Sequence, residues 1–223
     1  SLSLLNEIEQ LYLLSLVNNP LITNLSDLSS LQYIDNLRLV GWNHSENLDA
    51  LSGVSIEKMY ISESTTLSSL IGPNYIELRD ISLESNSNLV DIEPLSVASK
   101  LQRINLENNP LIKSLETLPA LTSIDRVRIS GMDGLVDLTG LEGIADAYEI
   151  SLNGNKGLVS IDSIASLKSV REISIHHNPI LNSLYLPVLT EIEGLAIHEN
   201  PQLCNSLVAP LGEKAQYVRT DIT

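Results

Sequence analysis

The sequence predicts a β-solenoid, in which the chain winds through stacked coils that each add a short strand to one parallel β-sheet. Three observations predict this fold. An apolar-x-apolar pair recurs every 22 or 23 residues, an asparagine often follows the pair at a fixed distance, and apolar residues then recur at every third position. We expect about nine right-handed coils of 22–23 residues in a single domain covering residues 1–223.

The repeat is clearest in three similar segments, "LSLVNNPLITNL" (14–25), "INLENNPLIKSL" (104–115) and "ISIHHNPILNSL" (173–184). Weaker copies fill the gaps between them at the same period. Because a constant period marks one structural unit repeated along the chain, each copy predicts one coil. The apolar pairs begin at Leu14, Leu37, Met59, Ile81, Ile104, Val127, Ile150, Ile173 and Leu195.

Each apolar pair predicts a short strand with one buried face, because alternate side chains of a strand point to the same side. After the pair, apolar residues follow at Ile112, Leu115 and Leu118. A period of three fits neither an α-helix nor a long strand. It predicts a chain that turns a corner every few residues and points one side chain inward at each corner.

An asparagine lies three residues after the second apolar residue in most copies. Its side chain has donors and an acceptor that can pair with inward-facing backbone groups, which cost about 1–3 kcal/mol each when unpaired. We therefore expect a stacked ladder, with less regular turns where Trp42, Ser64 and Met132 take the position. The predicted ladder is Asn19, Asn86, Asn109, Asn155, Asn178 and Asn200.

The start of the chain continues the same corner pattern at Leu5 and Ile8. Residues 1–11 therefore resemble the tail of a preceding coil, and we expect the chain to be part of a longer one.

Charge and composition limit the partners. The chain has 13 basic and 28 acidic residues, a formal net charge of −15, which disfavours nucleic acid and anionic membranes as partners. No stretch of 18 uncharged apolar residues is present, so we expect no membrane insertion. We expect the single cysteine, Cys204, to be buried, the alternative being a disulfide to a cysteine outside this sequence.

The frame "L-x-I-x-x-N-P-x-L", followed by apolar residues at every third position, resembles leucine-rich repeats. It is more similar to the receptor L-domain type, the ligand-binding modules of insulin- and epidermal-growth-factor-type receptors, with related repeats in fungal cell-wall and bacterial surface or secreted proteins. The resemblance covers residues 5–205. It implies an extracellular or cell-surface location, bacterial in type.

The segment "NPQLCNSLVAPLGEKAQY" (200–217) is similar to the terminal cap of the bacterial members. The resemblance implies a cap over residues 204–223, with a short helix from about Ser206 to Lys214 that turns Leu207, Val208 and Leu211 inward. The single cysteine and the few aromatic residues depart from the receptor ectodomains. For that reason no hormone-binding site is carried over.

A binding surface is expected where strand side chains point outward. The residue between the two members of each pair and the residue after the pair should both face solvent, Val40 and Ser62 included. Adjacent strands lie about 4.8 Å apart, which would put Glu84 beside Glu107. The predicted ligand-binding face is Arg38, Tyr60, Glu84, Asn105, Glu107, Arg128, Asn153, His176 and His198.

The histidines raise the question of a metal, because His176 and His198 should be neighbours. Their ring nitrogens could share an ion, with Glu199 or His177 as a further ligand. The sequence does not indicate a third metal ligand as clearly as it indicates these two. We therefore favour solvent-exposed or capping histidines and predict neither metal nor cofactor.

Glu84 and Glu107 are the best candidate pair for acid–base chemistry, because neighbouring carboxylates raise the pKa of one of them. With Arg103 and Arg128 they are similar to the charged residues of β-helical polysaccharide lyases. A solvated charged face is the favoured interpretation, and no nucleophile elbow, phosphate loop or zinc-protease motif occurs.

These observations favour a non-catalytic recognition or adhesion module that binds a protein, peptide or glycan through its strand face. One alternative is a structural spacer within a larger surface protein. The other is a polysaccharide-active β-helical enzyme, which would need Glu84 and Glu107.

Overall fold

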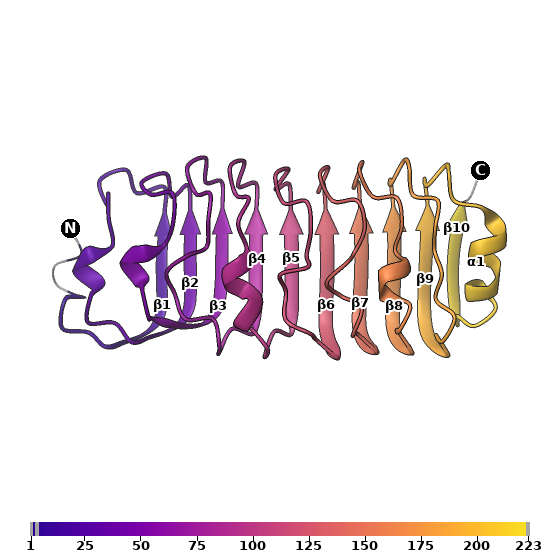
Figure 1. The fold of residues 1–223 in the computed structure, drawn as a ribbon, viewed down its shortest axis with the longest axis horizontal. Coiled ribbons are helices and arrows are strands. Elements are labelled where there is room, and N and C mark those ends of the chain that lie inside the picture. The colour runs from indigo at the N-terminus through magenta and orange to yellow at the C-terminus, as the bar shows by residue number, and fades with distance from the viewer. Residues whose placement is uncertain (1, 3–4, 222–223) are drawn as a thin grey trace.

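The computed structural model describes residue 2 and residues 5–221, which form a single all-parallel sheet of ten strands with few helices (Figure 1). The strands follow one another in sequence order across the sheet, as in a parallel β-solenoid. They are β1 (Gln10–Val17), β2 (Tyr33–Val40), β3 (Ser55–Ser62), β4 (Asp80–Glu84), β5 (Arg103–Glu107), β6 (Ser123–Ser130), β7 (Asp146–Asn153), β8 (Ser169–His176), β9 (Glu191–His198) and β10 (Tyr217–Asp221).

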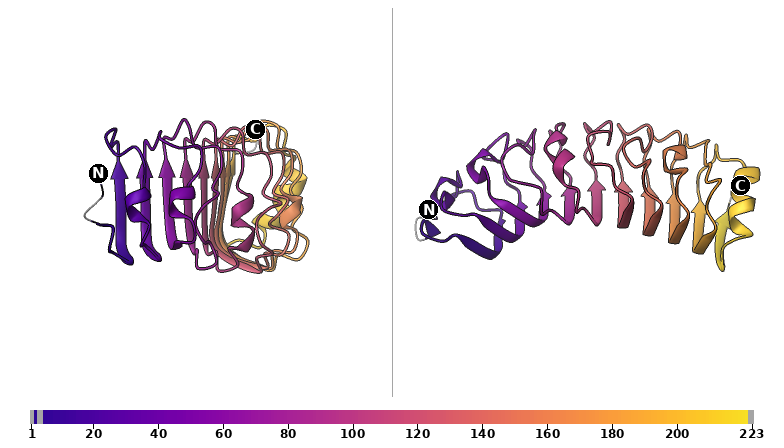
Figure 2. Two further views of the ribbon diagram at one scale, coloured as in Figure 1. Left: turned by 60° about the vertical axis from the view of Figure 1, so that its left-hand side comes forward. Right: turned by 60° about the horizontal axis from the view of Figure 1, so that its bottom comes forward.

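The sheet is open, with β1 and β10 at its two edges. Return segments behind the strands carry short 3-10 helices, and the rows of strands and return segments form two layers (Figures 1 and 2). Figure 2 also shows that the stack curves, with the strands along the inner side. The 3-10 helices are η2 (Ser26–Leu28), η3 (Asp49–Leu51), η4 (Glu93–Val97) and η5 (Asp162–Ile164).

The apolar pairs set the register of the sheet. The first member of each pair lies opposite the first member of the next, from Leu14↔Leu37 through to Ile173↔Leu195. Both members point into the core, where they meet corner residues such as Ile112 and Leu115. Nearly every core side chain is Leu, Ile or Val, so successive layers have similar thickness and can stack without voids.

The asparagine ladder forms at five of its six predicted positions, all of them buried. Each Oδ1 accepts the backbone N–H of the equivalent residue one repeat earlier, and each Nδ2 donates to a strand carbonyl of that earlier repeat. Ser64 and Met132 extend the ladder with their own side chains. The N–H of Asn109 contacts the Met132 sulfur at 3.4 Å, and Ser64 Oγ donates to the carbonyl of Trp42.

Asn19 does not join the ladder, contrary to the prediction. It is exposed, and its Nδ2 donates to the carbonyl of Val17 at 2.9 Å. Two causes are visible. No strand precedes β1 among the described residues, and the next repeat has Trp42 at the equivalent position, whose indole has no acceptor. The Trp42 Nε1 itself is buried and finds no hydrogen-bond partner in the described part of the chain, which makes this turn irregular as expected.

A left-handed residue directly precedes each ladder position, which the sequence pattern did not reveal. Glycine occupies three of these positions, and the other six are strained because a Cβ disfavours this conformation. The backbone N–H of most of them, such as Glu63, donates to the last carbonyl of the next strand. The nine residues, with φ between 49° and 65°, are Asn18, Gly41, Glu63, Ser85, Asn108, Gly131, Gly154, His177 and Glu199.

The C-terminal end contains the predicted helix and one strand that was not predicted. Helix α1 (Asn205–Gly212) buries Val208 and Leu211, while Leu207 is half-buried. After it the chain enters β10, which pairs with β9, so residues assigned to the cap extend the sheet. Ile222 and Thr223, the end of the predicted cap, lie outside the described residues.

Cys204 is exposed immediately before α1, which corrects the expectation of a buried thiol. At the other end Leu5 and Ile8 pack against the core as expected, while Ser1, Ser3 and Leu4 of the predicted tail lie outside the described residues. No helix in the described part of the chain has the length and apolarity needed to cross a membrane.

Candidate functional site

The outward side of the sheet, called here the strand face, carries five rows of solvent-facing side chains. The long strands bend near their start, where two consecutive residues point outward between buried ones, as Tyr12 and Leu13 do in β1. These rows hold all seven arginines and five of the seven tyrosines of the chain. All of them lie in strands except Arg79, which directly precedes β4. They are Arg38, Arg79, Arg103, Arg126, Arg128, Arg171, Arg219, Tyr12, Tyr33, Tyr60, Tyr148 and Tyr217.

All nine residues of the predicted ligand-binding face lie on this side, and none is buried. Arg38 stacks over the ring of Tyr60 at 5.2 Å, and the Tyr60 hydroxyl donates to Glu84 at 2.8 Å. Two positions expected to face solvent do not: Val40 and Ser62 are buried. They lie at the ends of β2 and β3, in the irregular part of the stack near Trp42.

Glu84 and Glu107 are neighbours on β4 and β5, as predicted. Glu84 accepts hydrogen bonds from Ser82 at 2.9 Å and Asn105 at 3.0 Å, in addition to Tyr60. Glu107 has one weak contact, at 3.4 Å, with the amide of Asn108. The pair therefore sits among neutral donors rather than among cations.

The two arginines expected near this pair bind other carboxylates. Arg103 contacts Asp80 at 3.0 Å and Asp125 at 3.4 Å. Arg128 makes a two-pronged contact with Glu149, at 2.8 and 2.9 Å, which raises the pKa of the guanidinium. The structure thus separates Arg103 and Arg128 from Glu84 and Glu107.

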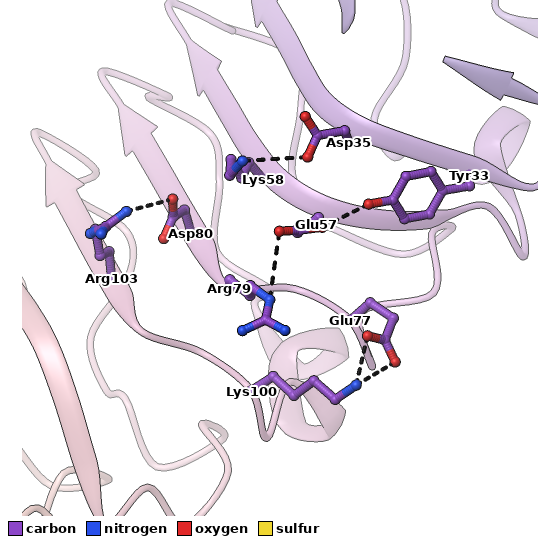
Figure 3. Close-up of polar contacts among 9 residues, drawn as sticks. All are labelled: Tyr33, Asp35, Glu57, Lys58, Glu77, Arg79, Asp80, Lys100 and Arg103. Atoms are coloured by element: carbon purple, nitrogen blue, oxygen red, sulfur yellow. Dashed lines mark hydrogen bonds and ion pairs between the residues drawn. The ribbon is translucent and has the colours of Figure 1, made fainter. Parts of the chain in front are cut away.

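Ion pairs across the strand face join neighbouring repeats (Figure 3). The Tyr33 hydroxyl donates to Glu57 at 2.7 Å, and this bond, with partial burial and the Glu57 charge, raises the pKa of Tyr33 to about 12. Glu57 also forms an ion pair with Arg79, at 3.6 Å. Further pairs in the same view are Lys58–Asp35, Lys100–Glu77 and Arg103–Asp80.

The histidines gather at the end of β8 and β9, as predicted. The rings of His176 and His198 stack with centroids 3.7 Å apart, and His177 meets His198 edge-on at 5.9 Å. His177 also pairs with Glu199 through Nε2 at 2.5 Å. Ser174 Oγ lies 2.5 Å from the His176 Nε2, whereas the His176 Nδ1 is buried and has no hydrogen-bond partner among the described residues.

This environment disfavours the protonated form of His176. Burial lowers the pKa of its imidazole, and the nearby His198 and His177 lower it further. Among the described residues, no group of three or more His, Cys, Asp or Glu side chains is arranged to hold a metal ion. His176 and His198 contact each other by ring stacking.

A groove of about 850 Å³ crosses β6–β9 near their first residues, a feature that the sequence did not reveal. We call it the bend groove, because it follows the bend at the start of these strands. Its floor is a row of apolar residues in which the small Ala147 stands between Ile124 and Val170. The full lining is Gln102, Ser123, Ile124, Asp125, Asp146, Ala147, Tyr148, Ser169, Val170, Arg171, Thr190, Glu191, Ile192, Glu193, Lys214 and Gln216.

Tyr148 is the aromatic residue of the bend groove and is 44% exposed. Two arginines flank its ring, Arg126 at 5.7 Å and Arg171 at 5.0 Å from the centroid. Arg171 also donates to the Tyr148 hydroxyl at 2.7 Å and pairs with Glu193 at 3.1 Å. These contacts hold the ring in one position, which reduces the entropy lost when a ligand binds against it.

Neither a comparison with models of known protein families nor a search of curated proteins finds a match to this chain. The likeness to receptor L domains therefore rests on the repeat pattern of the sequence.

Proposed function

We propose that this chain is a non-catalytic recognition module that binds a protein, peptide or glycan through its strand face. In this proposal it is a right-handed solenoid of about nine coils, of the receptor L-domain and leucine-rich-repeat type. It acts outside the cell or at the cell surface, in adhesion or recognition, as part of a longer bacterial protein.

One observation carries the proposal. The strand face holds all seven arginines and five of the seven tyrosines, although the chain as a whole is strongly acidic. Arginine and tyrosine are enriched among the residues that dominate binding energy at protein interfaces. Because the ion pairs and ring contacts described above fix many of these side chains, the face is pre-organised for a partner.

Screening labelled protein on peptide and glycan arrays tests this function. The double variant Tyr60→Ala with Arg128→Ser removes two outward side chains of the strand face. Tyr185→Ala with Lys113→Ser makes a comparable change on exposed return segments and is the matched control. We expect some ligands to bind saturably to the wild type and to the control. The strand-face variant should no longer bind these ligands. Ligands retained by the strand-face variant would contradict the proposal.

A spacer is the second candidate, and the ion pairs between neighbouring repeats favour it because they stiffen the stack along its axis. A spacer would show no saturable ligand on either array. The third candidate, a polysaccharide-active enzyme, has less support because Arg103 and Arg128 are held by other carboxylates.

A further inference from the structure

The bend groove has a negative rim. Four carboxylates line it, on Asp125, Asp146, Glu191 and Glu193, against two cations. Both cations are already engaged within the protein. Arg171 binds Glu193 and the Tyr148 hydroxyl, and Lys214 Nζ donates to the carbonyl of Leu189 at 2.6 Å.

Two of the four carboxylates lack a cationic partner. The Asp146 side chain has no hydrogen bond or ion pair among the described residues, and Glu191 only accepts a bond from Ser169 Oγ at 3.3 Å. Carboxylates that already face solvent beside a low-dielectric apolar floor attract positive charge more strongly than carboxylates on an open surface. The groove is therefore complementary to a cationic ligand.

We propose that the bend groove binds an extended, lysine- or arginine-bearing peptide segment of a partner protein. This inference rests on the proposed recognition function and names the ligand class for one part of the sheet. The peptide lies across β6–β9, roughly perpendicular to the strands, with its basic side chains directed at Asp146 and Glu191. The aliphatic stems of those side chains cover Ala147 and Val170.

The spacing of the carboxylates suits such a segment. Asp146 begins β7 and Glu191 begins β9, so the two residues are separated by two strand spacings, about 9.6 Å. Alternate residues of an extended peptide point the same way and lie about 6.6–6.8 Å apart, a distance that flexible lysine side chains can widen. A peptide with lysine at every second position can therefore reach both carboxylates at once.

The test uses a blocked peptide of alternating glycine and lysine with three lysines, and its affinity for the whole chain is measured by calorimetry. The same peptide with N-acetyl-lysine removes the charge and keeps the length. The groove variant is Asp146→Asn with Glu191→Gln. Asp49→Asn with Glu116→Gln changes the net charge equally at exposed positions on the return segments and serves as the control.

We expect the groove variant to lose about tenfold in affinity, because it removes two partly screened ion pairs, while the control stays close to the wild type. Added salt should weaken wild-type binding, and the acetylated peptide should not bind. Equal loss in both double variants would overturn the proposal, because binding would then follow net charge alone. No peptide binding, or binding of spermine or a glucosamine polymer in its place, would also overturn it.

The outcomes also separate this inference from the proposed function. Array ligands lost on Tyr60→Ala with Arg128→Ser, together with no binding of the lysine peptide, would remove the groove assignment and leave the recognition function standing. If the wild type bound no array ligand saturably and no lysine peptide, the recognition function would be removed as well.

Discussion

Asn178 and Asn200 are joined twice: the backbone N–H and the Nδ2 of Asn178 both donate to Oδ1 of Asn200, at 3.0 and 3.1 Å. Asn178 in turn accepts the N–H of Asn155 and donates to the carbonyl of Leu152. One short side chain thus satisfies backbone groups in the repeat before it, which is why the ladder can be buried.

Replacing Asn178 by alanine should destabilise the fold strongly. The change leaves the N–H of Asn155 and the carbonyl of Leu152 buried without this partner, at about 1–3 kcal/mol for each group. We expect the free energy of unfolding, measured by urea titration, to fall by about 2–5 kcal/mol. Asn153→Ala, at an exposed asparagine on the neighbouring strand, should change it little. Equal effects of the two substitutions would mean that the ladder contributes no special stability.

Gly140 and Gly154 allow steric crowding to be separated from backbone strain. Both have positive φ, but a Cβ on Gly140 would lie 2.1 Å from the carbonyl oxygen of Leu115, whereas a Cβ on Gly154 would meet nothing within 4 Å. Gly154→Ala should cost about 1–2 kcal/mol from strain alone. Gly140→Ala should cost about 1–3 kcal/mol more, because the backbone of the neighbouring repeat must move. Thermal and urea unfolding of the two variants measure the difference, and similar costs would contradict the close approach.

Stability should fall on mild acidification because of His176. Its pKa is lowered in the folded protein, so the unfolded chain, with an ordinary value of about 6.5, binds the proton more readily below that pH. The stability that His176 contributes to the fold is therefore fully present above about pH 6.5. It is lost as the pH falls from there towards the lowered pKa. Melting temperatures plotted against pH across this range should flatten in His176→Gln, which removes the titrating imidazole. An unchanged slope in His176→Gln would assign the effect to other groups.

The Tyr33–Glu57 contact can be followed by titrating tyrosine absorbance. Tyr33 should ionise at about pH 12, and Glu57→Gln should lower that pKa, because it removes the charge that the phenolate would face. The difference between the absorbance titrations of the wild type and of Tyr33→Phe identifies the signal of Tyr33. Glu93→Gln, on a return segment, is the control and should leave this signal unchanged. If Glu57→Gln left the titration of Tyr33 unchanged, the negative charge of Glu57 would not be a cause of the shift.

Cys204 should react at once with a thiol reagent in the folded protein, because it is exposed before α1. We expect one equivalent to be modified without denaturant, and the labelled protein to keep its circular dichroism spectrum. A thiol that reacts only after unfolding would contradict the exposed position.

Sequence reasoning was most effective where one residue type has one task in every repeat. The spacing of pairs such as Ile104 and Leu106 determined the register, because a slip by one residue would turn every apolar side chain to solvent. The ladder followed from the chemistry of asparagine. Strand β10 was missed because its segment, Tyr217–Asp221, alternates Val218 with Thr220 and lacks the apolar pair.

The candidate site was harder to predict, because it depends on differences between repeats. The bend groove requires two outward residues at the start of each strand, and a small residue, Ala147, among larger neighbours. Arg128 was expected near Glu107, but Glu149 lies in an outward row that the pair rule does not describe. A search for outward residues before each apolar pair would have found both Tyr148 and Glu149.

The hydrogen bonds between repeats have a consequence for how such a chain can change length. In the side-chain bonds of the ladder and of the strand face, the partners are 21 to 26 residues apart and belong to neighbouring repeats. Deleting one whole repeat would give each hydrogen-bonding group that lost its partner an equivalent partner in the next repeat. Deleting half a repeat would instead place core residues at surface positions and surface residues in the core. Duplication and loss of whole repeats could therefore lengthen or shorten the molecule in steps of one strand, about 4.8 Å, and reposition a binding surface without a new fold.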